Sequence, residues 1–354
     1  MSIITKYILS KYLKNFLLIL ASLELFFVAI DFLQNIKTLP NSANLQLLYI
    51  FYSSFFTLTI TLPLSLIFAL IITIIYLVKN NEMASFYALG FKPNNILFPI
   101  ISTATLITLF LMFLQTTPLA YSYEQKLKIL NNQYFTSVQE NIFLKYNDYF
   151  IYFEKLFPLQ KKATNIRIFK TKDNDIVETI IGSKAYYQNN RWYVIDTKII
   201  KKPQTIDWDN SKLDISYEKF LYTLEGFEPK IINNVSSANV QFSIKDAIYA
   251  ILLLDTQKLD TKKIRSILYS QIIIPFFIVP LIIIIFIASS INSRDFNSTK
   301  FSSLSIFLTL IIWGIIYLLQ KLSFNGVIIP ELATLLPVGL LFIFSYYFYR
   351  TKVS

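Results

Sequence analysis

Long apolar runs, separated by short polar segments, cover the first third and the last quarter of the chain. Each run is long enough to cross a hydrocarbon core of about 30 Å as a helix that rises about 1.5 Å per residue. The pattern therefore predicts six membrane spans, at residues 12–33, 45–78, 96–115, 264–290, 301–322 and 328–349. The second run exceeds one crossing, so its beginning is expected to tilt or to lie in the interface, and Pro63 to kink it.

The middle of the chain has a different pattern. Segments rich in β-branched and aromatic residues, partly alternating with polar positions, predict strands at residues 150–154, 165–169, 176–181 and 191–196. Turns rich in Asn and Asp separate them, and this spacing predicts a sandwich or jelly roll with Tyr152 pointing inward. A polar helical link at residues 121–133 and an amphipathic helix at residues 243–254 are expected on either side.

Composition agrees with a membrane protein. Apolar residues make up 54% of the chain, charged residues 16%, and the mean hydropathy is +0.50. The sequence has no Cys and no His, which excludes disulfides, thiol chemistry, His-ligated metals and His acid–base catalysis. None of its six Gly residues lies in a Walker or dinucleotide-binding loop, so the chain has no P-loop of its own. The first apolar run shows no small-residue cleavage site and is interpreted as an uncleaved span.

Lys and Arg in the short loops lie mostly on one side of the predicted spans. That side has Lys6, Lys11, Lys14, Lys79, Lys92, Arg294, Lys300, Arg350 and Lys352, whereas the other has Lys37 and Lys321. The positive-inside rule then predicts cytoplasmic termini and an exported middle region. The net charge of +11 suits a protein beside anionic lipid.

The polar-ended stretch between the second and third spans predicts a short helix. Asn80 or Asn81 is expected to cap its beginning, with Glu82 in the first turn, where the helix dipole favours a negative charge. Gly90 is expected to adopt the left-handed conformation just after its end, and Pro93 prevents its continuation.

One face of this short helix is apolar, with helical spacing between Met83, Phe86, Tyr87 and Gly90. The helix is too short to be stable alone. Either another protein grips it on the cytoplasmic side, or it is a polar turn whose apolar face lies against the ends of the spans.

Two acids lie in the first predicted span. Glu24 is near its middle, where a charge costs about 3 kcal/mol unless it faces protein or water or is protonated. Asp31 is near the outer end, where headgroups are within reach. Two interpretations are open for each side chain. It belongs to a substrate path or a proton site, or it makes an internal hydrogen bond between spans.

Basic residues gather where the middle region returns to the fourth span, at Lys258, Lys262, Lys263 and Arg265, and Lys37 has a similar depth after the first span. Such a cluster either holds phosphates or forms a solvated boundary beside anionic headgroups.

The short helix also carries a family resemblance. An acid, apolar positions and a small residue before Gly resemble the coupling-helix motif of the LptF/LptG permeases of the lipopolysaccharide export machine. The motif consists of Glu82, Met83, Ala84, Ser85, Phe86, Tyr87, Ala88, Leu89 and Gly90. Residues 148–154, 165–169 and 331–337 are further similarities, and the resemblance extends over essentially the whole chain.

The resemblance implies an α-helical membrane protein of six transmembrane helices with an inserted periplasmic all-β, jelly-roll-like domain. Residues 1–116 would form the first three spans, with the coupling helix at residues 80–92. Residues 117–261 would form the β domain with its helical links, and residues 262–354 the last three spans.

The resemblance implies a permease subunit of an ABC transporter in the bacterial inner membrane. Lipopolysaccharide would enter between spans one and five of two permeases, leave the outer leaflet and pass to a periplasmic bridge. Chain length and the region around residues 31–37 favour the G-type subunit (LptG), so the expected partner permease is the paralogous LptF. Further expected partners are a cytoplasmic ATPase dimer (LptB) and jelly-roll proteins of the LptC and LptA type. The resemblance implies no enzyme activity, cofactor, metal or nucleic acid for this chain.

The resemblance also assigns residues. The helix residues Glu82, Met83, Ala84, Phe86, Tyr87, Ala88, Leu89 and Gly90 would dock in a groove of the ATPase. Lys37, Lys262, Lys263 and Arg265 would contact lipid phosphates. Three alternatives remain: an export permease for another lipid or lipoprotein, a membrane-bound enzyme that acts on lipid, and a scaffold without transport activity. For the enzyme, the sequence shows no evident nucleophile or acid pair.

Overall fold

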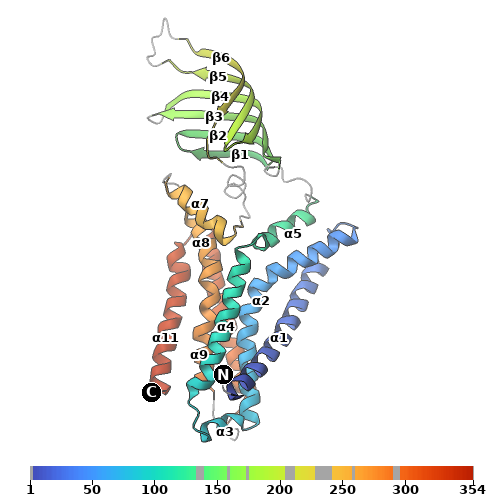
Figure 1. Cartoon of the computed structure of the whole chain (residues 1–354), viewed down its shortest axis with the longest axis vertical. Helices are drawn as coiled ribbons and strands as arrows, with labels where there is room; N and C mark the ends of the chain where they lie inside the picture. Colours follow the sequence, from blue (N-terminus) through green and yellow to red (C-terminus); the bar gives the residue numbers. More distant parts are fainter. Residues whose placement is uncertain are drawn as a thin grey trace. The chain divides into compact units, whose positions relative to one another are not determined.

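The structure is a computed structural model that describes residues 3–132, 139–157, 160–172, 175–203, 212–227, 241–256, 260–289 and 296–353. The chain divides into two compact units (Figure 1). The helical unit comprises Met1–Leu130, Phe242–Leu252 and Asp260–Ser354, and the β unit comprises Asn131–Gln241 and Leu253–Leu259.

Five helical segments of the described chain are long and apolar enough to cross a membrane. They are α1 (Ile3–Asn35), α2 (Ala43–Lys79), α4 (Pro93–Gln115), α10 (Ser298–Phe324), and Glu331–Thr351, which combines the π-helix η5 (Glu331–Leu335) with most of α11 (Leu336–Val353). The predicted fourth span is broken into α8 (Lys262–Ile272), the 3₁₀ turn η3 (Ile274–Phe277) and α9 (Ile278–Ile287), with a bend of 43°. Pro275 lies at the break, where its missing N–H interrupts the helical hydrogen bonds.

Helix α2 forms the centre of the helical unit. In the most apolar 18-residue stretch of α2, 67% of the residues are buried, compared with 11% in α1 and 17% in α10. A straight helix of its 37 residues would extend roughly 55 Å, and Figure 1 shows that α2 changes direction along its length. Pro63 lies inside it, as the expected kink requires. Around α2 the core buries Ile8 and Tyr12 of α1, Ile96 and Ile100 of α4, and Leu281 and Ile285 of α9.

The two ends of the helical unit differ in what they carry. Both chain termini and the short helix α3 (Glu82–Ala88) lie at one end (Figure 1). The helices that flank the β unit in the sequence, α5 (Ser122–Leu130) and α7 (Ile244–Thr256), lie at the opposite end. The loop charges predicted that the termini and the short helix share one side, and in the helical unit they lie at one end.

The β unit is a single antiparallel sheet of six described strands. The strands are β1 (Gln139–Tyr146), β2 (Tyr149–Phe157), β3 (Lys162–Lys172), β4 (Asp175–Gln188), β5 (Arg191–Lys201) and β6 (Asp214–Thr223). Each pairs with the next in the sequence, so the described strands form a meander without the crossover connections of a jelly roll. The four predicted strands lie inside β2 to β5, whereas β1 and β6 were not predicted.

Asn-rich turns impose this order. Asn147 between β1 and β2 has a φ of 51°, and Asn189 and Asn190 between β4 and β5 have φ values of 47° and 62°. Two successive positive φ values are typical of a type I′ turn, whose twist matches that of a tight hairpin. Neighbouring strands therefore pair with each other rather than across the sheet.

The core of the β unit surrounds Trp192, which is fully buried and donates from Nε1 to the Phe227 carbonyl at 2.7 Å. Phe153 packs on it with ring centroids 5.3 Å apart. The sheet tolerates only Gly at position 182, because a Cβ there would lie 2.1 Å from Val194 Cγ1.

The expected inward orientation of Tyr152 is wrong. Ile151 and Phe153, on either side of it, are fully buried in the core, so Tyr152 points to the opposite face. There its hydroxyl donates to Asn141 Oδ1 at 2.6 Å, and the Arg167 guanidinium lies 5.8 Å from its ring centroid.

Candidate functional site

The short helix between the second and third spans is present as α3, and its end is built as the sequence predicts. Gly90 has a φ of +85°. Its N–H bonds to the Tyr87 carbonyl and the Phe91 N–H to the Phe86 carbonyl, both at 3.0 Å. This pair of bonds is a Schellman motif, which requires a left-handed residue at that point.

The predicted side-chain cap at the beginning of α3 is wrong. Asn81 occupies the N-cap position, but its φ of 56° is left-handed and its side chain makes no capping hydrogen bond. Asn tolerates this conformation better than other residues that carry a Cβ. The left-handed residue lets the chain turn sharply from α2 into α3.

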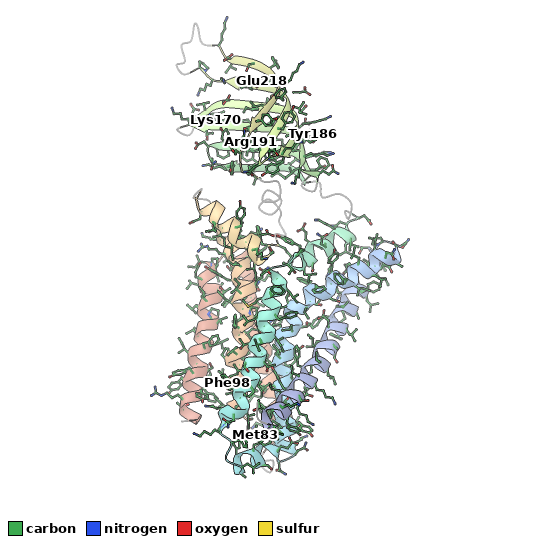
Figure 2. All side chains as sticks on the ribbon, in the orientation of Figure 1. Met83, Phe98, Lys170, Tyr186, Arg191 and Glu218 are labelled. Carbon is green, nitrogen blue, oxygen red and sulfur yellow. The ribbon has the colours of Figure 1, made fainter. Side chains whose placement is uncertain are left out.

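The apolar face of α3 packs on its own membrane spans. Met83 is 1% exposed, and Phe86 and Tyr87 pack against the core of the helical unit (Figure 2). Burial raises the pKa of the Tyr87 phenol, so this side chain stays neutral at physiological pH. On the other side of the helix Leu89 is 70% exposed, next to the exposed Ala88. The exposed residues of this stretch are therefore Ser85 and Ala88 to Gly90, whereas Met83, Phe86 and Tyr87 of the predicted stripe pack on the spans.

Glu82 joins α3 to the beginning of α1. The Tyr7 hydroxyl donates to Glu82 Oε1 at 2.9 Å, and Lys11 Nζ lies 4.0 Å from the centroid of the Tyr76 ring on α2. Glu82 Oε2 is buried and has no hydrogen-bond partner among the described residues. A buried carboxylate oxygen without a hydrogen-bond partner is energetically costly.

Glu24 makes internal contacts between the first two spans. Its Oε1 accepts from Thr57 and its Oε2 accepts from Thr61 at 2.7 Å, both on α2. Of the two interpretations from the sequence, the internal hydrogen bond agrees with these contacts.

Asp31 is the centre of a larger polar cluster. Its Oδ1 lies 2.6 Å from Lys126 Nζ on α5, and its Oδ2 accepts from Tyr49 at 2.7 Å and from Ser53 at 2.6 Å. The side chains of Lys126 and Asp31 are only 8% and 21% exposed. The aromatic rings of Tyr49, Phe56 and Tyr123 surround the Lys126 ammonium at 5.5 to 5.9 Å. Lys126 could not be identified as the partner from the sequence, because no pattern distinguishes it from the other polar residues of the link at residues 121–133.

The basic residues at the outer end are not equivalent. Arg265 Nη1 forms a 2.6 Å ion pair with Glu331 Oε1, at the beginning of the last span, and Tyr269 donates to the same oxygen at 3.2 Å. Lys263 lies 4.9 Å from the Phe324 ring centroid. Lys37 and Lys262 are exposed. Lys258 and Arg294 lie outside the described residues.

Within the part of the chain that the structure describes, no group of three or more acidic side chains is placed to hold a metal ion. The helical unit instead has apolar spans with α3 at the same end as both chain termini, and the β unit is inserted in the sequence after α4. The sequence model of the lipopolysaccharide export system permease LptF/LptG matches residues 6–351. The chain belongs to this family.

Membership of the LptF/LptG family identifies the chain as a multi-pass inner-membrane protein with a permease role in lipopolysaccharide export. The family is one of permeases rather than ATPases, and its members work within the export complex. The comparison with curated proteins returned no match. The β unit and the apolar spans of the structure agree with the fold that the resemblance implied.

Proposed function

We propose that this chain is a membrane permease subunit that extracts lipopolysaccharide from the outer leaflet of the inner membrane and passes it to a periplasmic bridge. The family match over nearly the whole chain carries this proposal. A paralogous permease completes the lipid path, and proteins of the LptC and LptA type continue it. In this pair the chain is the G-type subunit, and co-purification with an F-type partner in mild detergent tests that assignment.

The energy for transport comes from a separate cytoplasmic ATPase dimer of the LptB type that docks on α3. The chain has no P-loop, so it requires such a partner. The exposed last turn of α3 offers Ala88, Leu89 and Gly90 as apolar contacts. Glu82, at the other end of α3, has a buried carboxylate oxygen, Oε2, without a hydrogen-bond partner among the described residues. Because Met83, Phe86 and Tyr87 pack against the core of the helical unit, a movement of α3 is transmitted to the spans.

The end that carries α3 and both termini faces the cytoplasm, and the β unit is periplasmic. Lys6, Lys79, Lys92 and Arg350 belong to the α3 end of the helical unit, as the positive-inside rule requires. An ATPase in the cytoplasm then reaches α3 without crossing the membrane.

The lipid enters between α1 and α10 of the paired permeases. These two helices have the smallest buried shares among the continuous spans, and large apolar side chains such as Phe26 and Phe307 are more than half exposed. Such surfaces suit acyl chains and a partner permease. Lys37, Lys262, Lys263 and Arg265 contact the lipid phosphates at the outer end, with the exposed Lys37 and Lys262 free to reorient.

The core face of the β unit conducts the acyl chains. We expect a photoreactive residue at Leu144, which packs on this core but is partly exposed, to crosslink lipopolysaccharide in inverted membrane vesicles only when ATP is present. Phe143, the next residue on β1, points to the opposite face and is 59% exposed, so it is the matched control. Equal crosslinking at the two positions, or silence at Leu144 with ATP, contradicts the proposed conduit.

The whole proposal is tested in proteoliposomes that contain the paired permeases with and without the ATPase. Lipopolysaccharide release to an acceptor jelly-roll protein is expected only with the ATPase and ATP. Release by this chain alone overturns the proposal, because the chain would then carry its own source of energy.

A further inference from the structure

An apolar groove runs between α4, α9 and α11 at the end of the helical unit that carries α3. Its volume is about 920 Å³, near the upper end of the roughly 300–1,000 Å³ that small-molecule sites occupy. The walls include Phe91, Leu97, Phe98, Ile283, Phe342 and Tyr346. Figure 2 labels Phe98 on α4, toward the α3 end of that helix.

The groove opens on the lipid side of the spans. Phe98 is 71% exposed and Tyr346 is 66% exposed, and both belong to segments that cross the membrane. Among the described lining residues none comes from α10, and α1 contributes Thr5 from its first turn, about 30 Å along that helix from Phe26 of the lipopolysaccharide path proposed between α1 and α10. The groove therefore lies at the other end of α1 from that exposed surface. Bilayer lipid is the apolar material in contact with such a surface.

The groove has polar groups near the first turn of α4, besides Thr5 and Ser345, whose hydroxyl donates to the Phe342 carbonyl. Asn94 and Asn95 line it in the first turn of α4, and the Tyr349 hydroxyl donates to Asn94 Oδ1 at 2.6 Å. Two exposed cations are close to these residues in the sequence: Lys92 is two positions before Asn94, and Arg350 directly follows Tyr349. Neither α4 nor α11 contains an acidic residue, so the rim has a positive charge.

We propose that this groove binds an anionic phospholipid, with its acyl chains along Phe98 and Tyr346 and its phosphate beside Lys92 and Arg350. An apolar body with one polar, cationic end is complementary to that class of lipid. Placing the lipid in the cytoplasmic leaflet rests on the orientation proposed above, whereas the binding itself does not. A lipid wedged between α4 and α11 next to α3 connects the membrane to the helix that receives the ATPase.

Binding is tested by native mass spectrometry of the purified full-length protein in mild detergent, titrated with phosphatidylglycerol or phosphatidylcholine. Reversing both rim charges with Lys92→Glu and Arg350→Glu is expected to weaken phosphatidylglycerol binding about tenfold or more. The matched control, Lys14→Glu with Lys300→Glu, makes the same charge change at exposed positions outside the groove and is expected to leave binding unchanged. Equal affinity for both lipids, or equal loss in both variants, overturns the proposal.

The occupant is identified by a photoreactive benzoylphenylalanine in place of Phe98. Phosphatidylglycerol adducts are expected there, and not at Phe110, which lies about three turns further along α4 and is 59% exposed. A protein adduct at Phe98 means that a partner's transmembrane helix fills the groove and overturns the proposal. Both measurements omit ATP and lipopolysaccharide, so loss of export with intact phospholipid binding counts only against the proposed export function.

Discussion

Replacing Glu82 with Lys is expected to release the ATPase and stop lipopolysaccharide export. The change removes the acceptor that Tyr7 holds in place and puts a cation where Glu82 Oε2 lies buried without a partner among the described residues. Removing one partner of a buried charged contact in an interface costs about 2–5 kcal/mol, which weakens association roughly 30-fold to several thousand-fold. Co-purification of the ATPase and lipopolysaccharide at the cell surface are the measurements.

Two further variants separate the possible causes. Glu82→Gln keeps the shape of the side chain and removes its charge, and it is expected to give an intermediate loss. Tyr7→Phe removes the hydroxyl that bonds Glu82 Oε1 and Tyr76 but leaves the Glu82 carboxylate in place, so we expect a smaller loss with the ATPase still bound. Unchanged co-purification and normal surface lipopolysaccharide in Glu82→Lys contradict the coupling role of α3.

Replacing Lys126 with Ala is expected to destabilise the helical unit by about 3–5 kcal/mol, because it leaves the Asp31 carboxylate largely buried without its cation. The hydrogen bonds from Tyr49 and Ser53 remain but do not neutralise the charge. The link through α5 loses its connection to α1. Thermal unfolding of the purified protein in detergent measures the effect.

A double-mutant cycle isolates this ion pair. Asp31→Asn combined with Lys126→Met removes both charges and is expected to restore most of the stability that Lys126→Ala loses. Each single change is measured beside it. Additive losses in the double variant would show that Asp31 and Lys126 do not interact.

Local features of α3 and the sheet followed directly from the sequence. The end of α3 is specified by Gly90, since few other residues adopt its positive φ without strain. Asn189 and Asn190 specify the hairpin between β4 and β5 in the same way. The phase of β2 was not specified, because Ile151 and Phe153 on one face and Phe150 and Tyr152 on the other are all apolar.

Contacts between distant segments were beyond prediction. Asp31 and Lys126 are 95 residues apart and Arg265 and Glu331 are 66 residues apart, and no periodicity connects either pair. The apolar face of α3 was predicted correctly, but its spacing is the same whether it meets another protein or its own spans. In the structure Met83 packs on the core of the helical unit, so this face meets the chain's own spans.

The sequence by itself determined the membrane class, the apolar spans and the inserted β unit. These follow from run length, short-range periodicity and residue types, which are properties of the chain before it folds. Only the tertiary structure decided which charges are paired, which face of the sheet is the core and where a lipid-sized groove opens. Those features depend on which segments meet in space, and hydrophobicity drives such contacts without specifying the partners.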